Sequence, residues 1–208
     1  MTTLGVTGGI GSGKSAFVDR LATHAGVRAV RADDVAKRLM ADDPAVRAAL
    51  VARFGADMFA PDGTLDRARL AARVFADPAE LAALNAIVHP AVRQALHDAL
   101  AQARADGVRL FVYEAALLFE VGADRLLDAV VLVDAPLDVR VARVQARDGA
   151  SREAVEARMH SQIDPAVARA RTLAVGGTVV ENSGTRADLD ALADAQAAVW
   201  TAGAGGAA

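Results

Sequence analysis

Short apolar runs alternate along this chain with longer segments in which apolar residues recur every three or four positions. The short runs predict β-strands, because the strands of a parallel sheet are buried on both faces. They cover residues 3–7, 27–30, 110–113, 129–134 and 178–181. Strands that alternate with helical segments predict an α/β fold, a doubly wound parallel sheet of about five strands.

Helical spacing follows most of these strands. It predicts helices over residues 15–25, 137–147, 151–159 and 186–200, and one more that closes before Pro44. The same spacing assigns a buried face to two of these helices. The faces are Leu137, Val141 and Val144 in the helix after the fourth strand, and Leu189, Leu192, Ala195 and Val199 in the last helix.

Residues 44–107 interrupt the alternation of strands and helices. Helical patterns cover residues 44–54, 66–75 and 78–89, a turn is expected at 60–63, and Pro90 suits the first turn of another helix. The stretch is too long for a simple crossover, so we predict a helical insertion, which in a kinase would build the acceptor pocket. Asn85 and His89 lie one turn apart on it, although a single histidine near a helix end is more often structural than functional.

The segment Gly8-Gly9-Ile10-Gly11-Ser12-Gly13-Lys14-Ser15 stands between the first strand and the first helix. It fits G-x-x-x-x-G-K-[ST], in which glycines let successive backbone N–H groups face phosphate oxygens. The following helix adds its positive end, Lys14 reaches the β- and γ-phosphates, and the Ser15 hydroxyl can ligate Mg²⁺. A glycine-rich turn without a ligand is the plainer alternative, but the flanking strand and helix favour a nucleoside triphosphate site.

Two carboxylates follow strands at the edge where α/β sheets bind ligands. Asp33 follows the second strand and has two interpretations. In the functional one, it contacts the metal or accepts a proton from an attacking hydroxyl; in the structural one, it is the N-cap of the next helix. The sequence leaves both interpretations open. Glu114 follows the third strand, where such folds keep a carboxylate near Mg²⁺ or its waters.

Arg140, Arg143 and Arg147 form one line on the helix over residues 137–147, with no acidic residue on that line before Asp148. We favour a lid that closes over a triphosphate over a solvated charged face, because arginines in a closing hairpin stabilise transferring charge. The predicted plan is one domain over residues 1–201. It comprises a core (1–43, 108–136 and 172–201), the insertion (44–107), the lid (about 137–171) and a disordered tail (202–208).

Composition narrows the class of protein. The 208 residues are 53% hydrophobic and 24% charged, which suits a folded domain and excludes a disordered chain. The net charge of −3 gives no general attraction to nucleic acid or to an anionic membrane. Zero cysteines, no signal-peptide pattern and no long apolar run lead us to expect a cytoplasmic protein.

A small-molecule kinase fits this plan best. A guanine-nucleotide switch needs N-K-x-D and D-x-x-G, and neither occurs, while a motor ATPase is usually larger. The alternatives left open are another small-molecule or nucleotide kinase and a module that senses ATP without a second substrate. The lid arginines and Asp33 argue against a sensor. A protein that only senses ATP needs neither a base for an acceptor hydroxyl nor arginines that stabilise charge in the transition state.

The ordered motifs resemble those of the dephospho-CoA kinase family along nearly the whole chain up to Gly184. Many kinases share the phosphate loop, whereas the stretch from Asn85 to His89-Pro90, followed by residues 117–120, is highly specific. The resemblance rests on residues 7–15, 32–33, 54–55, 62–67, 84–90, 117–120, 143–148, 162 and 182–184.

This resemblance implies an ATP-dependent, Mg²⁺-requiring phosphorylation of the ribose 3′-hydroxyl of dephospho-CoA, which gives coenzyme A and ADP. With the spacing arguments it assigns catalysis to Lys14, Asp33 and Arg143, and the metal site to Ser15, Asp33 and Glu114. The expected ATP-binding residues are Gly8, Gly9, Gly11, Ser12, Gly13, Lys14, Ser15, Ala16, Arg143, Arg147 and Asn182. The expected substrate-binding residues are Asp33, Arg67, Asn85, His89, Leu117, Leu118, Glu120 and Arg140.

The resemblance also implies ATP and dephospho-CoA as partners, without nucleic acid or membrane, in a monomer or weak homo-oligomer. The sequence departs from the family pattern in places. Arg31 stands where the family often has an acidic residue, Ala16 replaces the usual Thr, Ala116 replaces a Pro, and Gly176-Gly177 replaces Ala-Asp. None of these changes removes a group that the mechanism requires.

Overall fold

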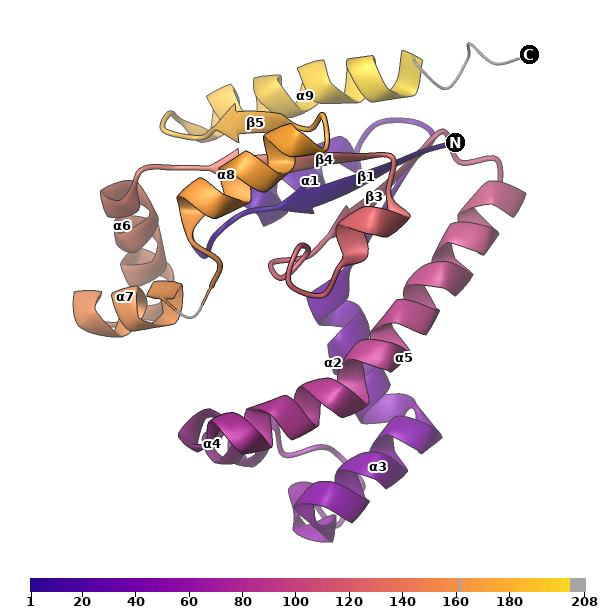
Figure 1. The fold of residues 1–208 in the computed structure, drawn as a ribbon, viewed down its shortest axis with the longest axis vertical. Helices are drawn as coiled ribbons and strands as arrows, with labels where there is room; N and C mark the ends of the chain where they lie inside the picture. The colour runs from indigo at the N-terminus through magenta and orange to yellow at the C-terminus, as the bar shows by residue number, and fades with distance from the viewer. Residues whose placement is uncertain (161, 203–208) are drawn as a thin grey trace. The chain divides into compact units, whose positions relative to one another are not determined.

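The computed structural model describes residues 1–160 and 162–202, and these form two compact units. Unit 1 consists of Met1–Arg31 and the described residues from Gln102 onward, and unit 2 of Ala32–Ala101. Each unit has its own hydrophobic core, and Figure 1 traces the chain through both. In this division, the helix that follows the second strand belongs to unit 2. From the sequence we had assigned that helix to the core.

Unit 1 is built on a parallel sheet of five strands, in the order β2-β3-β1-β4-β5 among the described residues. The strands are β1 (Thr2–Thr7), β2 (Val27–Arg31), β3 (Leu110–Glu114), β4 (Ala129–Asp134) and β5 (Thr178–Glu181). The register pairs Val6 with Glu114 and Thr7 with Leu132. The carboxyl ends of the central strands therefore meet where β1 enters the glycine loop, which confirms the predicted doubly wound sheet.

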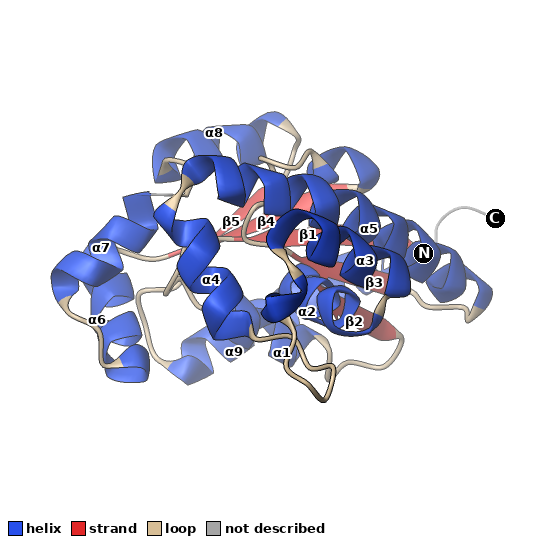
Figure 2. Cartoon of the chain, turned by 90° about the horizontal axis from the view of Figure 1, so that it is seen from below, coloured by secondary structure: helices blue, strands red, loops and turns tan. Residues whose placement is uncertain are grey.

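Helices cover both faces of this sheet. Unit 1 contains α1 (Lys14–Leu21), α6 (Leu137–Asp148), α7 (Arg152–His160), α8 (Pro165–Ala174), α9 (Arg186–Ala202) and the 3-10 turn η2 (Ala123–Leu126). Figure 2 shows the sheet between α8 on one side and α1 with α9 on the other. Phe17 and Leu189 bring α1 and α9 into the main core, and Leu118 packs against Gly5 on the opposite face.

The sequence placed some helix boundaries and faces wrongly. Helix α1 ends at Leu21 and not at residue 25. Just after this end, the Thr23 hydroxyl donates a hydrogen bond to the Arg20 carbonyl at 2.7 Å. Leu137 is the first residue of α6 and is 51% exposed. The buried residues of α9 are Leu189, Ala193 and Ala197, whereas Leu192, Ala195 and Val199 are exposed. Small alanines let α9 approach α1 closely, and a search for large apolar residues misses such a face.

Helix α8 was not predicted, although its start carries a recognisable pattern. The Asp164 carboxylate accepts hydrogen bonds from the N–H groups of Ala166 and Val167, and Pro165 occupies the first helical position. The predicted tail also begins one residue too early, because Ala202 belongs to α9. Residues 203–208 of that tail lie outside the described residues.

Unit 2 is helical, and its core lies among its own helices. It contains α2 (Ala32–Asp42), α3 (Pro44–Phe54), η1 (Ala56–Met58), α4 (Arg67–Ala76) and most of α5 (Pro78–Ala105). Leu50, Phe54 and Leu70 lie at the centre of this core. A new helix at Pro90 was predicted wrongly, since α5 runs through that residue. Proline removes one backbone hydrogen bond and kinks a helix without ending it where the flanking turns persist.

Within the described residues, no helix combines the length and the apolar character that crossing a membrane requires.

Candidate active site

The glycine loop joins β1 to α1 at the carboxyl edge of the sheet. The Ser12 N–H donates to the Gly9 carbonyl at 3.1 Å, and Gly13 precedes α1 with a left-handed φ of 95°. A Cβ at Gly13 would lie 2.2 Å from Asn182 Nδ2, so only glycine fits there. Because Gly13 is the N-cap residue and has no side chain to cap α1, the positive end of the helix is available to an anion.

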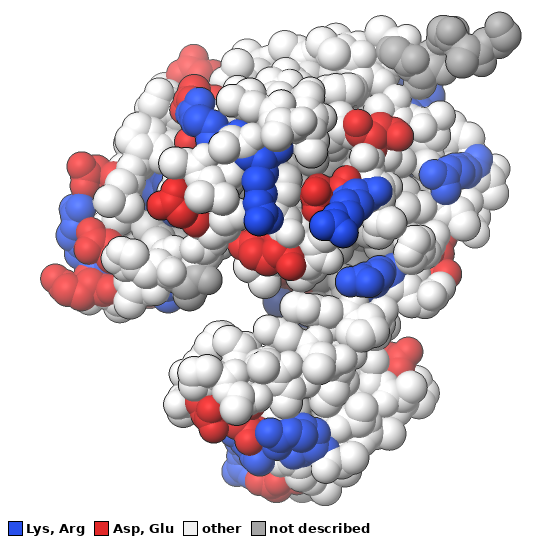
Figure 3. All heavy atoms as spheres, in the orientation of Figure 1, with Lys and Arg blue, Asp and Glu red and all other residues white. Residues whose placement is uncertain are grey.

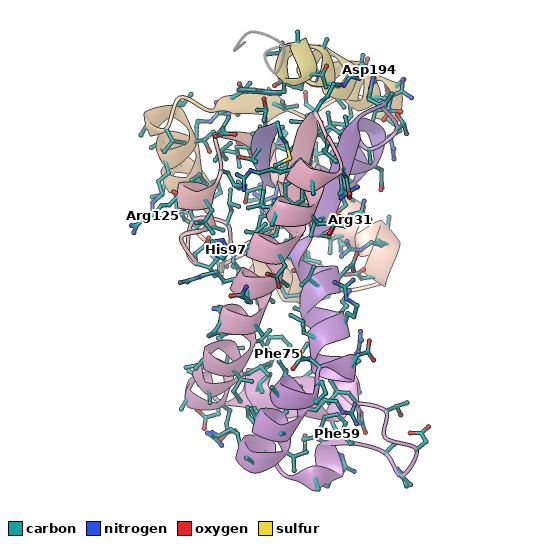
Figure 4. The ribbon with its side chains drawn as sticks, turned by 90° about the vertical axis from the view of Figure 1, so that its right-hand side faces the viewer. Arg31, Phe59, Phe75, His97, Arg125 and Asp194 are labelled. Carbon is teal, nitrogen blue, oxygen red and sulfur yellow. The ribbon has the colours of Figure 1, made fainter. Side chains whose placement is uncertain are left out.

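Side chains beside the loop complete a polar site. The Ser15 hydroxyl donates to Glu114 Oε1 at 2.6 Å, and Glu114 is only 6% exposed. Arg31 Nε donates to the other carboxylate oxygen of Glu114 at 2.9 Å and also pairs with Asp19. Arg31 comes from the end of β2 and is labelled in Figure 4. Lys14 forms no ion pair with any residue that the structure describes, so its ammonium group is available for phosphates.

Ser15 and Glu114 fit a Mg²⁺ ion that arrives with a nucleotide. Because the hydroxyl proton of Ser15 is donated to Glu114, a lone pair on the Ser15 oxygen is left for a cation. Protein Mg²⁺ sites commonly use one or two protein oxygens, and phosphates and waters supply the rest. No cluster of three or more His, Cys, Asp or Glu side chains in the described part of the chain would hold a metal alone. The residues therefore fit a metal that the phosphates help to bind.

Asn182 ties the loop to α6. Its Nδ2 donates to the Ser12 carbonyl at 2.7 Å, and its Oδ1 accepts from Arg143 Nη2 at 3.3 Å. Two buried polar atoms in this region, Ser12 Oγ and Arg143 Nη1, have no partner among the described residues. Unpaired buried donors are costly, and a bound ligand commonly supplies the missing partner. Arg143 and the loop thus present an unfilled hydrogen-bonding site, whereas the Asn182 amide is already used by the protein.

The sequence indicated that the three lid arginines form one row without partners. The structure shows that this was wrong, because Arg140 and Arg147 both have partners. Arg140 is 5% exposed and donates its Nε to the Ile10 carbonyl, while Arg147 forms two hydrogen bonds to Asp148 at 2.6 and 2.9 Å. Arg147, and after it Arg158, hold the pKa of Asp148 well below its usual range. Figure 3 shows acidic and basic side chains interspersed over α6 and α7. Spacing along one helix cannot reveal two of these partners, since Ile10 lies in the phosphate loop and Asn182, which contacts Arg143, follows β5.

A cavity of about 530 Å³ opens beside the loop within unit 1. Its walls include Gly8, Gly9, Asp134, Arg140 and Met159, and its volume suits a small-molecule ligand. Asp134 ends β4, and its carboxylate pairs with Arg169 of α8 at 3.3 Å. We did not predict a role for Asp134 from the sequence. Like Asp33 and Glu114, however, it is an acidic residue at the carboxyl end of a strand, so the same pattern identifies it.

In unit 2, the predicted acceptor residues lie on three helices. Asp33 is the second residue of α2, so it is not the N-cap of that helix, and that alternative was wrong. Arg67 begins α4 and donates to the Lys37 carbonyl at 3.2 Å. Asn85 and His89 both lie on α5, where burial and the nearby Arg93 lower the pKa of His89. Their roles toward an acceptor remain predictions.

In unit 1, the residues that follow β3 differ in accessibility. Leu118 is fully buried, whereas Leu117 is 38% exposed. Glu120 Oε1 accepts a hydrogen bond from the Ile163 N–H at 3.3 Å, which links this segment to the loop before α8. Of these two leucines, only Leu117 has an exposed side chain that a ligand could contact.

Comparison with known proteins gives one family. A model of the dephospho-CoA kinase family matches residues 2–188. The dephospho-CoA kinase of Salinibacter ruber is 47% identical over 189 residues, which cover 91% of this chain and 92% of that protein. The dephospho-CoA kinase of Thermobifida fusca is 42% identical over 200 residues, covering 96% and 95%.

Solved structures with a similar fold cover nearly the whole chain. The protein TT1252 from Thermus thermophilus superposes with a TM-score of 0.77 at 38% identity, covering 95% of this chain and 97% of that one. Dephospho-CoA kinase from Campylobacter jejuni gives a TM-score of 0.68 at 25% identity, covering 97% and 98%. The family match spans the loop, the helical unit 2 and the helices α6 and α7, and this chain belongs to the dephospho-CoA kinase family.

Proposed function

We propose that this protein transfers the terminal phosphoryl group of ATP to the ribose 3′-hydroxyl of dephospho-CoA, giving coenzyme A and ADP, the final step of CoA biosynthesis. The observation that carries the proposal is the family match over residues 2–188, which includes both the phosphate loop and unit 2. The loop geometry supports the same chemistry. At the carboxyl edge of the sheet lie the uncapped start of α1, the Ser15–Glu114 pair and Lys14, which has no ion pair among the described residues.

Phosphoryl transfer depends mainly on positioning and on charge stabilisation. In the proposed mechanism, the loop N–H groups and Lys14 hold the triphosphate, and the Arg143 guanidinium, whose Nη1 is buried without a partner among the described residues, donates to it. Asp33 orients the acceptor hydroxyl and takes its proton. Ser15, Glu114 and Asp33 would hold a Mg²⁺ ion, which would neutralise charge on the phosphates.

The remaining residues of the proposed acceptor site are those of unit 2 and of the segment after β3. Arg67, Asn85 and His89 in unit 2, and Leu117 and Glu120 in unit 1, are the positions at which we expect contacts with dephospho-CoA. We further propose a cytoplasmic enzyme, a monomer or weak homo-oligomer, that requires neither nucleic acid nor a membrane. The net charge of −3 supports this last point, because it offers no general attraction to polyanions.

The test is ADP release from Mg-ATP with dephospho-CoA, adenosine, AMP or shikimate as acceptor, and without acceptor. We expect strong release with dephospho-CoA alone and a product phosphorylated at the ribose 3′-oxygen. Release with a different acceptor alone would show another small-molecule kinase on this fold. Folded protein that binds ATP but releases no ADP with any acceptor would point to a nucleotide sensor.

A further inference from the structure

Ile10, at a position that the pattern G-x-x-x-x-G-K-[ST] leaves open, packs against the α6–α7 hairpin. Its side chain lies against the small cluster of Val141, Val144 and Val155, which joins α6 to α7. All three valines are at most 1% exposed. A loop side chain partly buried against a neighbouring helical hairpin ties the position of the loop to that of the hairpin.

Both backbone groups of Ile10 are also held by side chains of this region. Its N–H donates to Gln162 Oε1 at 2.8 Å, and its carbonyl accepts from Arg140 Nε at 3.0 Å. Gln162 comes from the connection between α7 and α8, and Arg140 from α6. The peptide groups on either side of Ile10 are therefore oriented by two residues that are more than 120 positions away in the chain.

Arg140 has little freedom to move away from the loop. It is 5% exposed, and burial lowers its pKa although the neighbouring Asp134 opposes that shift. Its guanidinium packs against Gly9. At Gly11, where φ is +80°, a Cβ would lie 2.5 Å from the Arg140 carbonyl oxygen, so the α6 backbone also abuts the loop. One residue of α6 thus contacts Gly9, Ile10 and Gly11 in succession.

We propose that Ile10 anchors the phosphate loop to the α6–α7 hairpin, and that Gln162 and Arg140 are positioning residues that hold the loop in its nucleotide-binding conformation. The inference rests on the proposed function only in that the loop binds ATP. Neither residue needs to touch the phosphates. They use the N–H and C=O of Ile10 and make no demand on the N–H groups of Gly11 or Gly13. Because a preorganised loop loses less entropy on binding, removing the anchor weakens ATP binding.

Gln162 offers the sharper test, because Arg140 is buried and its loss endangers folding. In Gln162→Leu the acceptor for the Ile10 N–H is lost, whereas Gln162→Glu keeps an oxygen acceptor at the same place. The matched control is Gln145→Leu. Gln145 is also a glutamine and belongs to the hairpin, but its side chain donates to the Ala150 carbonyl at 3.4 Å and not to the phosphate loop. All three variants are made in the full chain.

Two measurements are compared across these variants. Amide hydrogen exchange of Ile10 is followed by NMR in the nucleotide-free protein, and the dissociation constants of Mg-ATP and Mg-ADP are measured by calorimetry. In Gln162→Leu we expect Ile10 exchange to accelerate and both dissociation constants to rise by roughly tenfold, the upper end for one hydrogen bond. Gln162→Glu should restore Ile10 protection, and Gln145→Leu should leave both quantities near the wild-type values.

Unchanged Ile10 exchange in Gln162→Leu would overturn the anchor. Faster Ile10 exchange with nucleotide dissociation constants within twofold of wild type would overturn the positioning role. If Gln162→Leu fails to fold, Ile10→Ala against Ile10→Val tests the packing half of the anchor by the same calorimetry, and equal affinities would contradict it. Since nucleotide binding is measured without an acceptor, failure of the proposed acceptor specificity would leave these results intact.

Discussion

Lys14 is the residue whose environment points most directly to a phosphate ligand. It begins α1, next to an uncapped helix end, and has no ion-pair partner among the described residues. A preorganised cation at this place stabilises charge that develops on the transferring phosphoryl group. We expect Lys14→Ala to lower kcat by at least ~10²-fold, the cost of removing one such group. Steady-state ADP release at saturating Mg-ATP measures the effect.

The other lysine of the chain supplies the control. Lys37 lies on α2, is 55% exposed at its side chain, and stands 3.6 Å from Asp34. Exposed pairs of this kind contribute little to stability or binding. Lys37→Ala should therefore keep kcat within about twofold of wild type. Equal losses in both variants would show that the Lys14 effect is not specific to the loop.

Asp33 and Asp34 allow the proposed base to be separated from a helix effect. Both lie in the first turn of α2, where a carboxylate interacts favourably with the helix dipole. Only Asp33 is proposed to take the acceptor proton. Asp33→Asn should cut kcat far more than it weakens ATP binding, whereas Asp34→Asn should alter neither by more than about twofold, since its helix contribution is small. Similar kinetics for the two variants would assign Asp33 a structural role.

At the scale of elements, the contact between α1 and α9 is held by a titratable cluster. Asp194 of α9, labelled in Figure 4, accepts hydrogen bonds from Arg20 at 2.7 and 2.8 Å and lies 2.8 Å from His24 Nε2. These bonds, chiefly that of Arg20, lower the pKa of Asp194 to about 2. The folded pKa lies below the unfolded value, so the stabilisation is complete above the unfolded pKa and disappears as the pH falls toward about 2.

Thermal unfolding of Asp194→Asn against wild type tests this linkage. The variant should unfold at a lower temperature at pH 6, and the difference in Tm should shrink as the pH falls from about 4 to about 2. The control is Asp190→Asn, because Asp190 pairs directly with Arg186 within α9 and acts on Arg20 of α1 only through its charge, without a hydrogen bond of the kind that Asp194 accepts. A difference in Tm that stays constant down to pH 2.5 would contradict the assigned pKa.

Element positions were largely predictable because they depend on local patterns. The apolar run that ends at Asp134 gave β4 without error, and the glycine spacing gave the loop. The errors came where three-dimensional partners decide. Pro90 reads as a helix start, but α5 continues through it, and the alanines of α9 are buried only because α1 lies opposite. Ion pairs such as Arg31–Glu114 and the contacts of Ile10 join distant residues, and no spacing rule reveals them.

At the scale of the whole molecule, a kinase and a sensor differ in how many ligands stabilise the fold. Any ligand that binds only the folded state raises the free energy of unfolding, by about 2.7 kcal/mol at 100 times its dissociation constant. The proposed enzyme has an ATP site at the loop and a second site for its acceptor. Mg-ATP and dephospho-CoA should therefore each raise the Tm of the full chain, and AMP should not reproduce the dephospho-CoA shift.

Removing the metal sharpens this prediction. Chelation of Mg²⁺ should reduce the Tm shift given by ATP, because Ser15 and Glu114 are expected to bind the metal only together with phosphates. In Ser15→Ala the ATP shift should be smaller and less dependent on Mg²⁺, while the dephospho-CoA shift should persist. A chain that ATP stabilises and dephospho-CoA leaves unchanged at any concentration would be a sensor, since an enzyme with an acceptor site must bind its acceptor.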